Sequence, residues 1–324
     1  PANQIPVSRR ADASIAVVGN PNSGKSTLFN RLTGLRQRIG NYPGVTVERH
    51  IGTLKVGEKS LELVDLPGTH ALSAHSLEEQ IAVDVILGHM EGTATPDGIL
   101  AVVDATNLYQ GLYLVQQLLE LERPLVVALT MADAAELEGL KIDISGLTGR
   151  LGGVPVCPVI ATSGQGVDKL RDALSRITEV QPPEPGKTWP ELTAAARELA
   201  AHAPANTRIA EVERLLIDGP SEAKQEFLGR FDAGAPAALH ELRQQLFGNE
   251  PPLATEARVR YRWVREVLDE VVQQSPPFYG WQARITAWLN QPIPGTIGLF
   301  LVMAIVFQAV FAWATPVMDV IDSA

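Results

Sequence analysis

Between residues 14 and 180 the chain alternates short apolar runs with amphipathic stretches. The apolar runs are continuous series of Val, Ile and Leu, as expected for strands buried on both faces. They predict strands at residues 14–18, 45–56, 60–64, 98–103, 125–129 and 154–159. Helical spacing predicts helices at 25–33, 76–87, 108–121, 144–151 and 167–177. This alternation is typical of an α/β domain, here residues 14–180, whose mostly parallel sheet carries helices on both faces.

The pattern changes after a stiff, proline-rich linker at residues 181–188. Residues 189–274 are rich in Ala, Glu, Leu, Arg and Gln with helical spacing, and Gly and Pro interrupt them several times. This composition predicts a small all-α domain. A polar N-terminal segment, residues 1–13, precedes the α/β domain, and residues 275–294 connect the helical domain to a final apolar run.

The apolar run at residues 295–315 has no charged residue and is long enough for a helix that crosses a bilayer. Arginines precede it and aspartates follow it, so the positive-inside rule places the long N-terminal part in the cytoplasm. The alternative is a buried helix of a soluble domain. Four of these arginines lie close together, and they either face acidic lipid or form a solvated helix face. They are Arg258, Arg260, Arg262 and Arg265.

Composition narrows the classes of function. The 324 residues carry a net charge of −10, which argues against a nucleic-acid partner because such proteins need a basic surface. The single cysteine, Cys157, cannot form an internal disulfide, and this fits a reducing compartment. The six histidines and this cysteine show no metal-ligand spacing, so we expect no iron site in this segment.

A complete phosphate-binding loop, GNPNSGKS, lies between the first predicted strand and the first predicted helix. Its two glycines let backbone N–H groups point inward, where they and the positive end of the helix bind phosphate oxygens. Lys25 adds an ammonium group and the Ser26 hydroxyl is placed to bind Mg²⁺. The residues predicted to contact the nucleotide here are Gly19, Asn20, Pro21, Asn22, Ser23, Gly24, Lys25, Ser26 and Thr27.

Two further segments fit the triphosphate end of a nucleotide. Asp65 follows a predicted strand and can hold Mg²⁺ through water, while Pro67 leads to Gly68, whose N–H can bond the γ-phosphate. Thr46 can supply a second hydroxyl to Mg²⁺ if its loop closes on the triphosphate. The alternatives are a turn or cap residue for Asp65 and an ordinary strand residue for Thr46. The loop residues beside Thr46 that we expect at the nucleotide are Gly44 and Val45.

We expect the purine base of the nucleotide to bind beside the segment that follows the strand at 125–129, where the sequence reads TMAD. The Asp133 carboxylate can accept hydrogen bonds from N1–H and the exocyclic amine of guanine, whereas adenine would present a lone pair at N1. A second loop, after the strand at 154–159, can approach the purine with a backbone N–H. The residues predicted around the base are Thr130, Met131, Asp133, Ala161, Thr162 and Ser163.

The ordered set GNPNSGKST, NYPGVTVE, DLPG and TMAD, followed by a helical domain and an apolar span, resembles the N-terminal cytosolic part of the bacterial ferrous-iron transporter family FeoB. The resemblance implies a G domain, a GDI-like helical domain and the first segment of a membrane permease. It implies switch roles for Thr46 and Asp65, guanine binding by Asp133, and a K⁺ ligand at Asn22. The implied catalytic residues are Lys25, Thr46 and Gly68, and the implied cofactors are GTP or GDP, Mg²⁺ and K⁺.

The chain departs from common G proteins at two positions. Thr130 stands where an asparagine is usual, and its hydroxyl cannot copy an amide that both donates and accepts, so we expect weaker selection of GTP over ATP. Thr69 stands where Ras-type proteins carry a glutamine that orients water. We therefore expect slow hydrolysis unless a bound cation supplies charge stabilisation.

We hypothesise a GTPase module in the bacterial inner membrane, with its N-terminal domains in the cytoplasm and its switch loops coupled to a ferrous-iron permease. Small accessory Feo-type proteins and a second copy of the chain are candidate partners. One alternative is a soluble ribosome- or tRNA-associated GTPase, which would need a basic appendage. The other is a nucleotide-sensing regulator with negligible turnover.

Overall fold

The computed structural model describes residues 11–34, 37–42, 45–72, 76–88, 90, 93–183, 189–205, 207–219, 222–274, 288–289 and 291–309. The chain divides into two compact units, which are described separately. The first comprises Pro1–Glu136 and Leu140–Ser275, and the second comprises Leu137–Gly139 and Pro276–Ala324. The predicted N-terminal segment therefore lies almost wholly outside the described residues.

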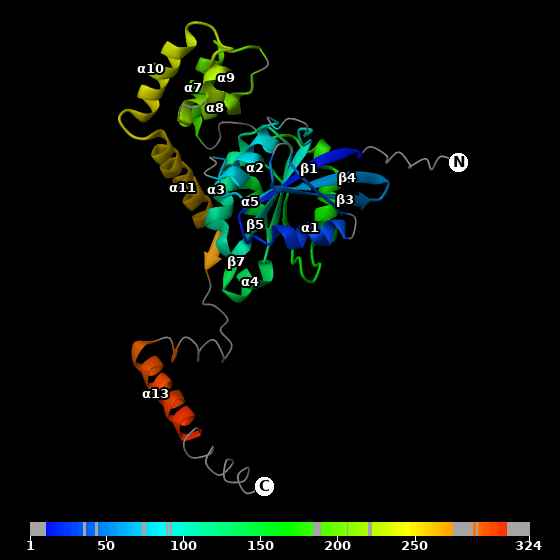
Figure 1. Cartoon of the computed structure of the whole chain (residues 1–324), viewed down its shortest axis with the longest axis vertical. Helices are drawn as coiled ribbons and strands as arrows, with labels where there is room; N and C mark the ends of the chain where they lie inside the picture. The colour runs from blue at the N-terminus through cyan, green and yellow to red at the C-terminus, as the bar shows by residue number, and fades with distance from the viewer. Residues whose placement is uncertain are drawn as a thin grey trace, which may run out of the picture. The chain divides into compact units, whose positions relative to one another are not determined.

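The first unit is built on a seven-stranded sheet with the order β2-β3-β4-β1-β5-β6-β8. Figure 1 labels β1, β3, β4 and β5 of this sheet. Five strands, β4, β1, β5, β6 and β8, run parallel, whereas β2 and β3 are antiparallel to their neighbours. The strands are β1 (Ala13–Gly19), β2 (Gln37–Asn41), β3 (Glu48–Val56), β4 (Lys59–Asp65), β5 (Gly98–Asp104), β6 (Leu125–Thr130) and β8 (Val156–Pro158). The predicted α/β fold with a mostly parallel sheet is confirmed.

Helices cover both faces of the sheet, because its buried strands point successive side chains in opposite directions. In β1, Ala16 and Val18 join an apolar cluster that includes side chains of α2, α3 and α5, and Ile15 and Val17 join a second cluster with α1 and α6. The helices of this part are α1 (Lys25–Thr33), α2 (Leu77–Leu87), η1 (Ala105–Asn107), α3 (Leu108–Leu119), α4 (Ala132–Leu137), α5 (Ile144–Arg150), α6 (Val167–Ser175) and η2 (Ile177–Glu179).

A group of helices follows, with its own apolar cluster that includes Trp189, Leu216 and Phe247. The helices are α7 (Pro190–Ala200), α8 (Ile209–Ile217), α9 (Glu222–Leu228), α10 (Ala235–Phe247) and α11 (Pro252–Val271). The last of them, α11, also packs on α3 and α5 and contributes Val264 and Val267 to the core under the sheet. β9 (Val272–Gln274) then pairs antiparallel with β7 (Leu140–Ile142). α11 and β9 thus fasten the helical region to the sheet.

The second unit contains α13 (Pro292–Gln308), a helix of 17 residues without a charged side chain and without a buried residue. It covers part of the predicted span at 295–315, whose last residues lie outside the described part of the chain. Within the described residues, no helix combines the length and the apolar character needed to cross a membrane. The membrane span stays a prediction.

Candidate nucleotide-binding site

The phosphate loop, residues 19–26, joins the end of β1 to the start of α1. Asn22 and Gly24 take left-handed backbone conformations, with φ of 64° and 79°, which bend the loop. At Gly19 a Cβ atom would lie 2.5 Å from the carbonyl oxygen of Val102, so only glycine fits there. The first turn of α1 has no acidic residue that would repel an anion from the positive end of the helix. The loop therefore has the form of a phosphate cradle.

Lys25 and Asp65 form an ion pair beside this cradle. Lys25 Nζ lies 2.5 Å from Asp65 Oδ1, and each side chain is 11% exposed. The sheet explains their meeting, since Asp65 ends β4 and is in register with Val17 on the parallel strand β1, which leads into the loop. The structure thus brings together the ammonium group and the carboxylate that the sequence predicts for phosphate and Mg²⁺.

The segment that contains Pro67 and Gly68 lies directly on the phosphate loop. Thr69 N–H donates to the carbonyl oxygen of Gly19 at 3.2 Å. A Cβ atom on Gly68 would lie 3.1 Å from Pro21 Cγ, so glycine permits this close approach. The segment that carries Gly68 therefore lies close enough to the cradle for the Gly68 N–H to contact a phosphate held there.

Two contacts of this segment are not predicted by the sequence. Asn20 Nδ2 donates to His70 Nδ1 at 3.2 Å and links the phosphate loop to the chain after Gly68. Thr69 is fully buried, and its hydroxyl donates to the carbonyl oxygen of Ala71 at 2.6 Å. Because its only proton is used in that bond, Thr69 supplies no donor to a water molecule near the phosphates.

The predicted switch-one residue Thr46 lies in the exposed segment between β2 and β3, and no described residue hydrogen-bonds to its side chain. Gly44 lies outside the described residues. Val45 N–H donates a hydrogen bond to the carbonyl oxygen of Tyr42 at 3.3 Å. Tyr42 itself is buried, and this burial raises its pKa to about 12. No hydrogen bond joins the Thr46 side chain to Lys25 or Asp65, and its Mg²⁺ role stays a prediction.

The two segments predicted around the base follow β6 and β8, which are neighbouring parallel strands and therefore end at the same edge of the sheet. Met131 has a φ of 54°, and Asp133 is exposed in the first turn of α4. In the second segment, Arg31 Nη2 donates to the carbonyl oxygen of Ser163 at 2.8 Å. The residues that the fold places at this edge are Thr130, Met131, Asp133, Ala161, Thr162 and Ser163. Thr130 differs from the others because its side chain is buried.

The donors of this site fit a magnesium ion and a phosphate tail. A hydroxyl at Ser26 and a carboxylate at Asp65 are the hard oxygen ligands that Mg²⁺ prefers. Ser26 and Thr27 are exposed in the first turn of α1, and the Asn22 side chain is exposed in the loop. A Cβ atom would meet the Val102 carbonyl oxygen at Gly19 and Pro21 at Gly68, so the two glycines permit the close backbone packing that shapes the cradle.

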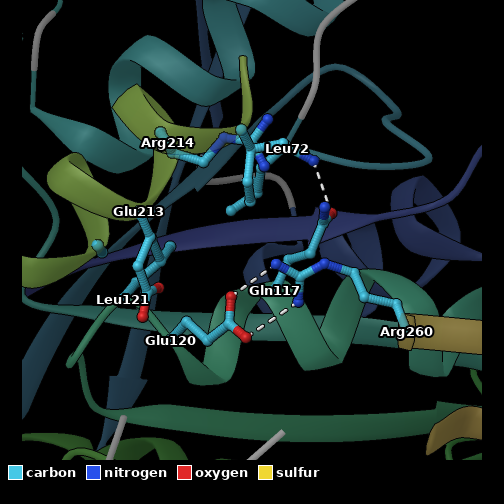
Figure 2. A pocket seen from close by; sticks show the side chains of 9 residues that line it. Leu72, Gln117, Glu120, Leu121, Glu213, Arg214 and Arg260 are labelled. Atoms are coloured by element: carbon cyan, nitrogen blue, oxygen red, sulfur yellow. Dashed lines mark hydrogen bonds and ion pairs between the residues drawn. The ribbon is translucent and has the colours of Figure 1, made fainter. Parts of the chain in front are cut away.

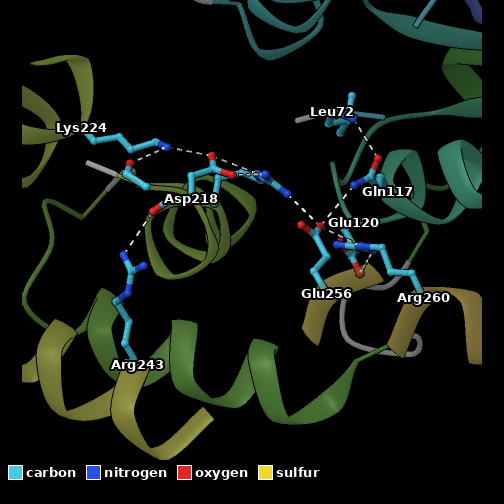
Figure 3. Close-up of polar contacts among 10 residues, drawn as sticks. Leu72, Gln117, Glu120, Asp218, Lys224, Arg243, Glu256 and Arg260 are labelled. Atoms are coloured by element: carbon cyan, nitrogen blue, oxygen red, sulfur yellow. Dashed lines mark hydrogen bonds and ion pairs between the residues drawn. The ribbon is translucent and has the colours of Figure 1, made fainter. Parts of the chain in front are cut away.

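A second polar assembly, which the sequence did not predict, links the segment after Gly68 to the helical region (Figure 3). Leu72 N–H donates to Gln117 Oε1 at 2.8 Å, and Gln117 Nε2 donates to Glu256 Oε1 at 3.2 Å. We call the four charged side chains around this contact the buried ionic cluster. Its members are Glu120, Arg214, Glu256 and Arg260.

Arg260 is the centre of the buried ionic cluster. Its Nη1 and Nη2 donate to the two carboxylate oxygens of Glu120 at 3.0 and 2.8 Å, and its Nε donates to Glu256 Oε1 at 2.8 Å. Arg214 Nη1 reaches the same Glu256 oxygen at 2.8 Å. Burial alone would raise the pKa of Glu256, but the charges of Arg214 and Arg260 outweigh it and lower the pKa below the ordinary value. The cluster joins α3, α8 and α11.

A small pocket adjoins this cluster, and Leu72, Glu120, Glu213 and Arg260 are among its lining residues (Figure 2). Glu213 is 2% exposed, and its Oε1 accepts a hydrogen bond from the Thr193 hydroxyl at 2.6 Å. Burial, together with the charge of Glu120, raises the pKa of Glu213 to about 7. The pocket lies between the helical region and the α/β part of the same unit.

The structure corrects the interpretation of the arginine run on α11. Arg260 is 1% exposed and belongs to the buried ionic cluster, so it forms no part of a basic surface. Arg262 and Arg265 are exposed, and Arg258 pairs with Glu250. The sequence spacing could have indicated that Arg260 is buried, because the buried residues of α11 follow one helical stripe. They are Glu256, Arg260, Val264, Val267 and Val271.

Comparison with known proteins agrees with this geometry. The sequence profile of the family described as Ferrous iron transport protein B matches residues 13–174. The Fe(2+) transporter FeoB of Escherichia coli strain K12 is 38% identical over 265 residues, which are 80% of this chain and 33% of that protein. The chain thus spans about a third of the length of the curated relative it matches.

Two solved structures are similar over most of the chain. One is a point mutant of S. thermophilus NFeoB bound to GDP, with a TM-score of 0.66 and 30% identity, covering 81% of this chain and 100% of that one. The other is the cytosolic domain of the T. maritima FeoB iron transporter in its GMPPNP form, with a TM-score of 0.64 and 27% identity, again covering 81% and 100%. Both structures are of guanine-nucleotide complexes.

Proposed function

The chain belongs to the Ferrous iron transport protein B family, and from this premise we propose that it is the cytosolic GTPase module of a membrane transporter for Fe²⁺. The observation that carries the proposal is the ion pair of Lys25 and Asp65 beside a glycine-rich cradle at the start of α1. In P-loop NTPases a lysine of the loop contacts the phosphates and an aspartate after a nearby strand holds the metal ion. The similar structures with GDP and GMPPNP support a guanine nucleotide as the ligand.

Binding of GTP would redistribute the partners of the ion pair. The backbone N–H groups of the loop and the Lys25 ammonium would hold the phosphate oxygens, while Ser26, Asp65 and Thr46 would hold Mg²⁺. When bound, Mg²⁺ neutralises charge on the β- and γ-phosphate oxygens. Gly68 N–H would bond the γ-phosphate and so sense its presence.

Hydrolysis transfers the γ-phosphoryl group to water and breaks its bond to the bridging β–γ oxygen. The protein's part is to position the phosphates and to stabilise the charge that develops on them. Thr69 supplies no donor for the water, so we infer slow turnover. A K⁺ ion held by Asn22 beside the phosphates would supply the missing positive charge.

The chain after Gly68 provides a route from the nucleotide to the helical region. Leu72 N–H is held by Gln117, and Gln117 contacts Glu256 in the buried ionic cluster of α11. A movement of the switch segment on loss of the γ-phosphate would change the first of these bonds. α11 continues into β9 and then into the residues that lead to the predicted span. We infer that nucleotide state reaches the membrane by this route.

The transport part of the proposal rests on the family. The apolar residues 295–315 would form the first membrane segment of a permease in the bacterial inner membrane, with the nucleotide site in the cytoplasm. Accessory Feo-type proteins and a second copy of the chain remain candidate partners. Iron is the cargo of the permease, and the described residues contain no group of three or more His, Cys, Asp or Glu side chains that could hold a metal ion.

Phosphate release from GTP with Mg²⁺, measured on the full chain in KCl and in NaCl, tests the proposal. We expect slow release that is faster in KCl and that is abolished in Lys25→Ala. Lys59→Ala, which changes an exposed lysine at the far end of β4, is the matched control and should behave like the wild type. Binding of GTP without release in either salt would identify a nucleotide sensor, and absence of both would contradict the proposed function.

A further inference from the structure

Residues 160–166, which lie between β8 and α6, include the second group of residues expected at the purine, and we call them the base loop. Backbone hydrogen bonds close the loop on itself. Ile160 N–H donates to the carbonyl oxygen of Gln165 at 2.9 Å, and Gly164 N–H donates to the carbonyl oxygen of Ile160 at 2.8 Å. Among the described residues, none accepts a hydrogen bond from the backbone N–H groups of residues 161–163. The tip of the loop therefore offers backbone donors to a bound purine.

Arg31, in the last turn of α1, contacts the base loop at two neighbouring residues. Its Nη2 donates to the carbonyl oxygen of Ser163 at 2.8 Å. Its guanidinium group also lies directly against Gly164, because a Cβ atom at that residue would overlap with Nη2. Gly164 has a φ of 88°, so glycine permits both the backbone conformation and the close approach. The helix that starts at the phosphate cradle thus also contacts the base loop.

The contact with Arg31 ties down one peptide group of the base loop. The Ser163–Gly164 peptide is trans, so its C=O and its N–H point in opposite directions. Arg31 donates to the C=O, and the carbonyl oxygen of Ile160 accepts from the N–H, so both polar groups of this peptide are held. A loop held in one conformation loses less conformational entropy when a ligand binds to it. A bound base should therefore be retained longer.

The contact is separate from the packing of α1. The buried residues of this helix are Leu28, Phe29, Leu32 and Thr33, whereas the Arg31 side chain is exposed. Removing the guanidinium group would therefore leave the apolar face of α1 intact. The role of Arg31 is to connect the helix to the base loop.

We propose that Arg31 is a positioning residue that fastens the base loop to α1 and thereby slows the release of a bound guanine nucleotide. The inference rests on the proposed function, because it concerns the same nucleotide site. It predicts that Arg31 acts on ligands that have a purine base and leaves the phosphate cradle unaffected.

The test is stopped-flow release of a fluorescent GDP derivative from the full chain in mild detergent with Mg²⁺, together with competition by inorganic triphosphate. Arg31→Met keeps the aliphatic stem and removes the donors. It should raise the dissociation rate constant of GDP about 2- to 10-fold, as expected for one lost hydrogen bond. Arg31→Lys keeps a donor and should return the rate toward the wild-type value. Triphosphate has no base and should bind equally well to the wild type and to Arg31→Met.

Arg176→Met is the matched control, because Arg176 is an exposed arginine at the end of α6 remote from the base loop, and its side chain makes no hydrogen bond or ion pair with the described residues. It should leave the release of GDP unchanged. If Arg31→Met does not fold, Arg31→Ala compared with Arg31→Lys gives the same contrast.

An unchanged GDP release rate in Arg31→Met would overturn the inference. Weaker binding of triphosphate to that variant would also overturn it, because the effect would then lie in the phosphate cradle. Failure of the wild type to bind GDP would instead contradict the proposed function.

Discussion

Replacing Arg260 by methionine should destabilise the first unit strongly. The change removes three hydrogen bonds of 2.8 to 3.0 Å to Glu120 and Glu256, whose side chains are 9% and 1% exposed. Methionine fills much of the same space, so the effect comes from the carboxylates that lose a cation. Arg214 still pairs with Glu256 at 2.8 Å, so the larger loss falls on Glu120.

Breaking a buried ion pair by removing one partner costs about 3–5 kcal/mol, because the other charge stays in a poorly solvated place. A domain of this kind has a free energy of unfolding of about 5–15 kcal/mol, so Arg260→Met should remove a large fraction of it. The nearby Arg258 offers a matched control on the same helix. Its ion pair with Glu250 is about half exposed, and Arg258→Met should change stability by no more than about 1 kcal/mol.

The assay is urea denaturation of the full chain in mild detergent, followed by far-ultraviolet circular dichroism. We expect the midpoint of Arg260→Met to fall well below that of Arg258→Met. The double variant Glu120→Gln with Arg260→Met should recover part of the loss, because it removes the charge that Arg260 had neutralised. Equal midpoints for the two arginine variants would refute the reasoning and show that the cluster does not hold α11 to α3.

Two further predictions concern the cradle and the pocket. Gly19→Ala places a Cβ atom 2.5 Å from the Val102 carbonyl oxygen and should reduce GDP affinity, measured by fluorescence titration, at least tenfold. Gly149→Ala in α5 is the control and should leave the affinity unchanged, because nothing lies within 4 Å of the added Cβ atom. Equal affinities of the two variants would contradict the proposed cradle. Burial raises the pKa of Glu213 from 4.5 to about 7, so the folded protein keeps a proton that the unfolded chain releases, and stability from this group falls as pH rises between these values. The expected fall in the free energy of unfolding is on the order of 3 kcal/mol, and Glu213→Gln should abolish it. Denaturation midpoints of the wild type and the variant at pH 5 and 7.5 test this. Parallel pH profiles of the two proteins would contradict the raised pKa of Glu213.

The parallel core of the sheet was predictable because its strands are continuous apolar runs. The bounds of α1 were predicted correctly, since Gly24 marks its start and Leu28, Phe29 and Leu32 follow helical spacing. β2 was missed because its sequence, QRIGN, is polar and its one large apolar residue, Ile39, is 67% exposed. The strand expected at 45–56 begins only at Glu48 and runs antiparallel, since a turn from Tyr42 to Val47 precedes it.

The candidate site was predictable where a local motif fixes both residue type and position, as in the loop of Gly24 and Lys25. The partners that depend on distant pairing could not be derived from sequence. Thr130 meets Ser23 only because β6 and β1 flank β5 in the folded sheet. Gln117 meets the Leu72 backbone only after α3 has packed beside the switch segment.

Calorimetric titration of the full chain with GDP and Mg²⁺ tests the central claim most directly. The cradle at the start of α1 and the exposed carboxylate of Asp133 predict saturable one-to-one binding, with ADP binding more weakly under the same conditions. Lys25→Ala, in which Asp65 loses its partner, should bind GDP far more weakly. Absence of heat with GDP, or binding that Lys25→Ala leaves unchanged, would contradict the account.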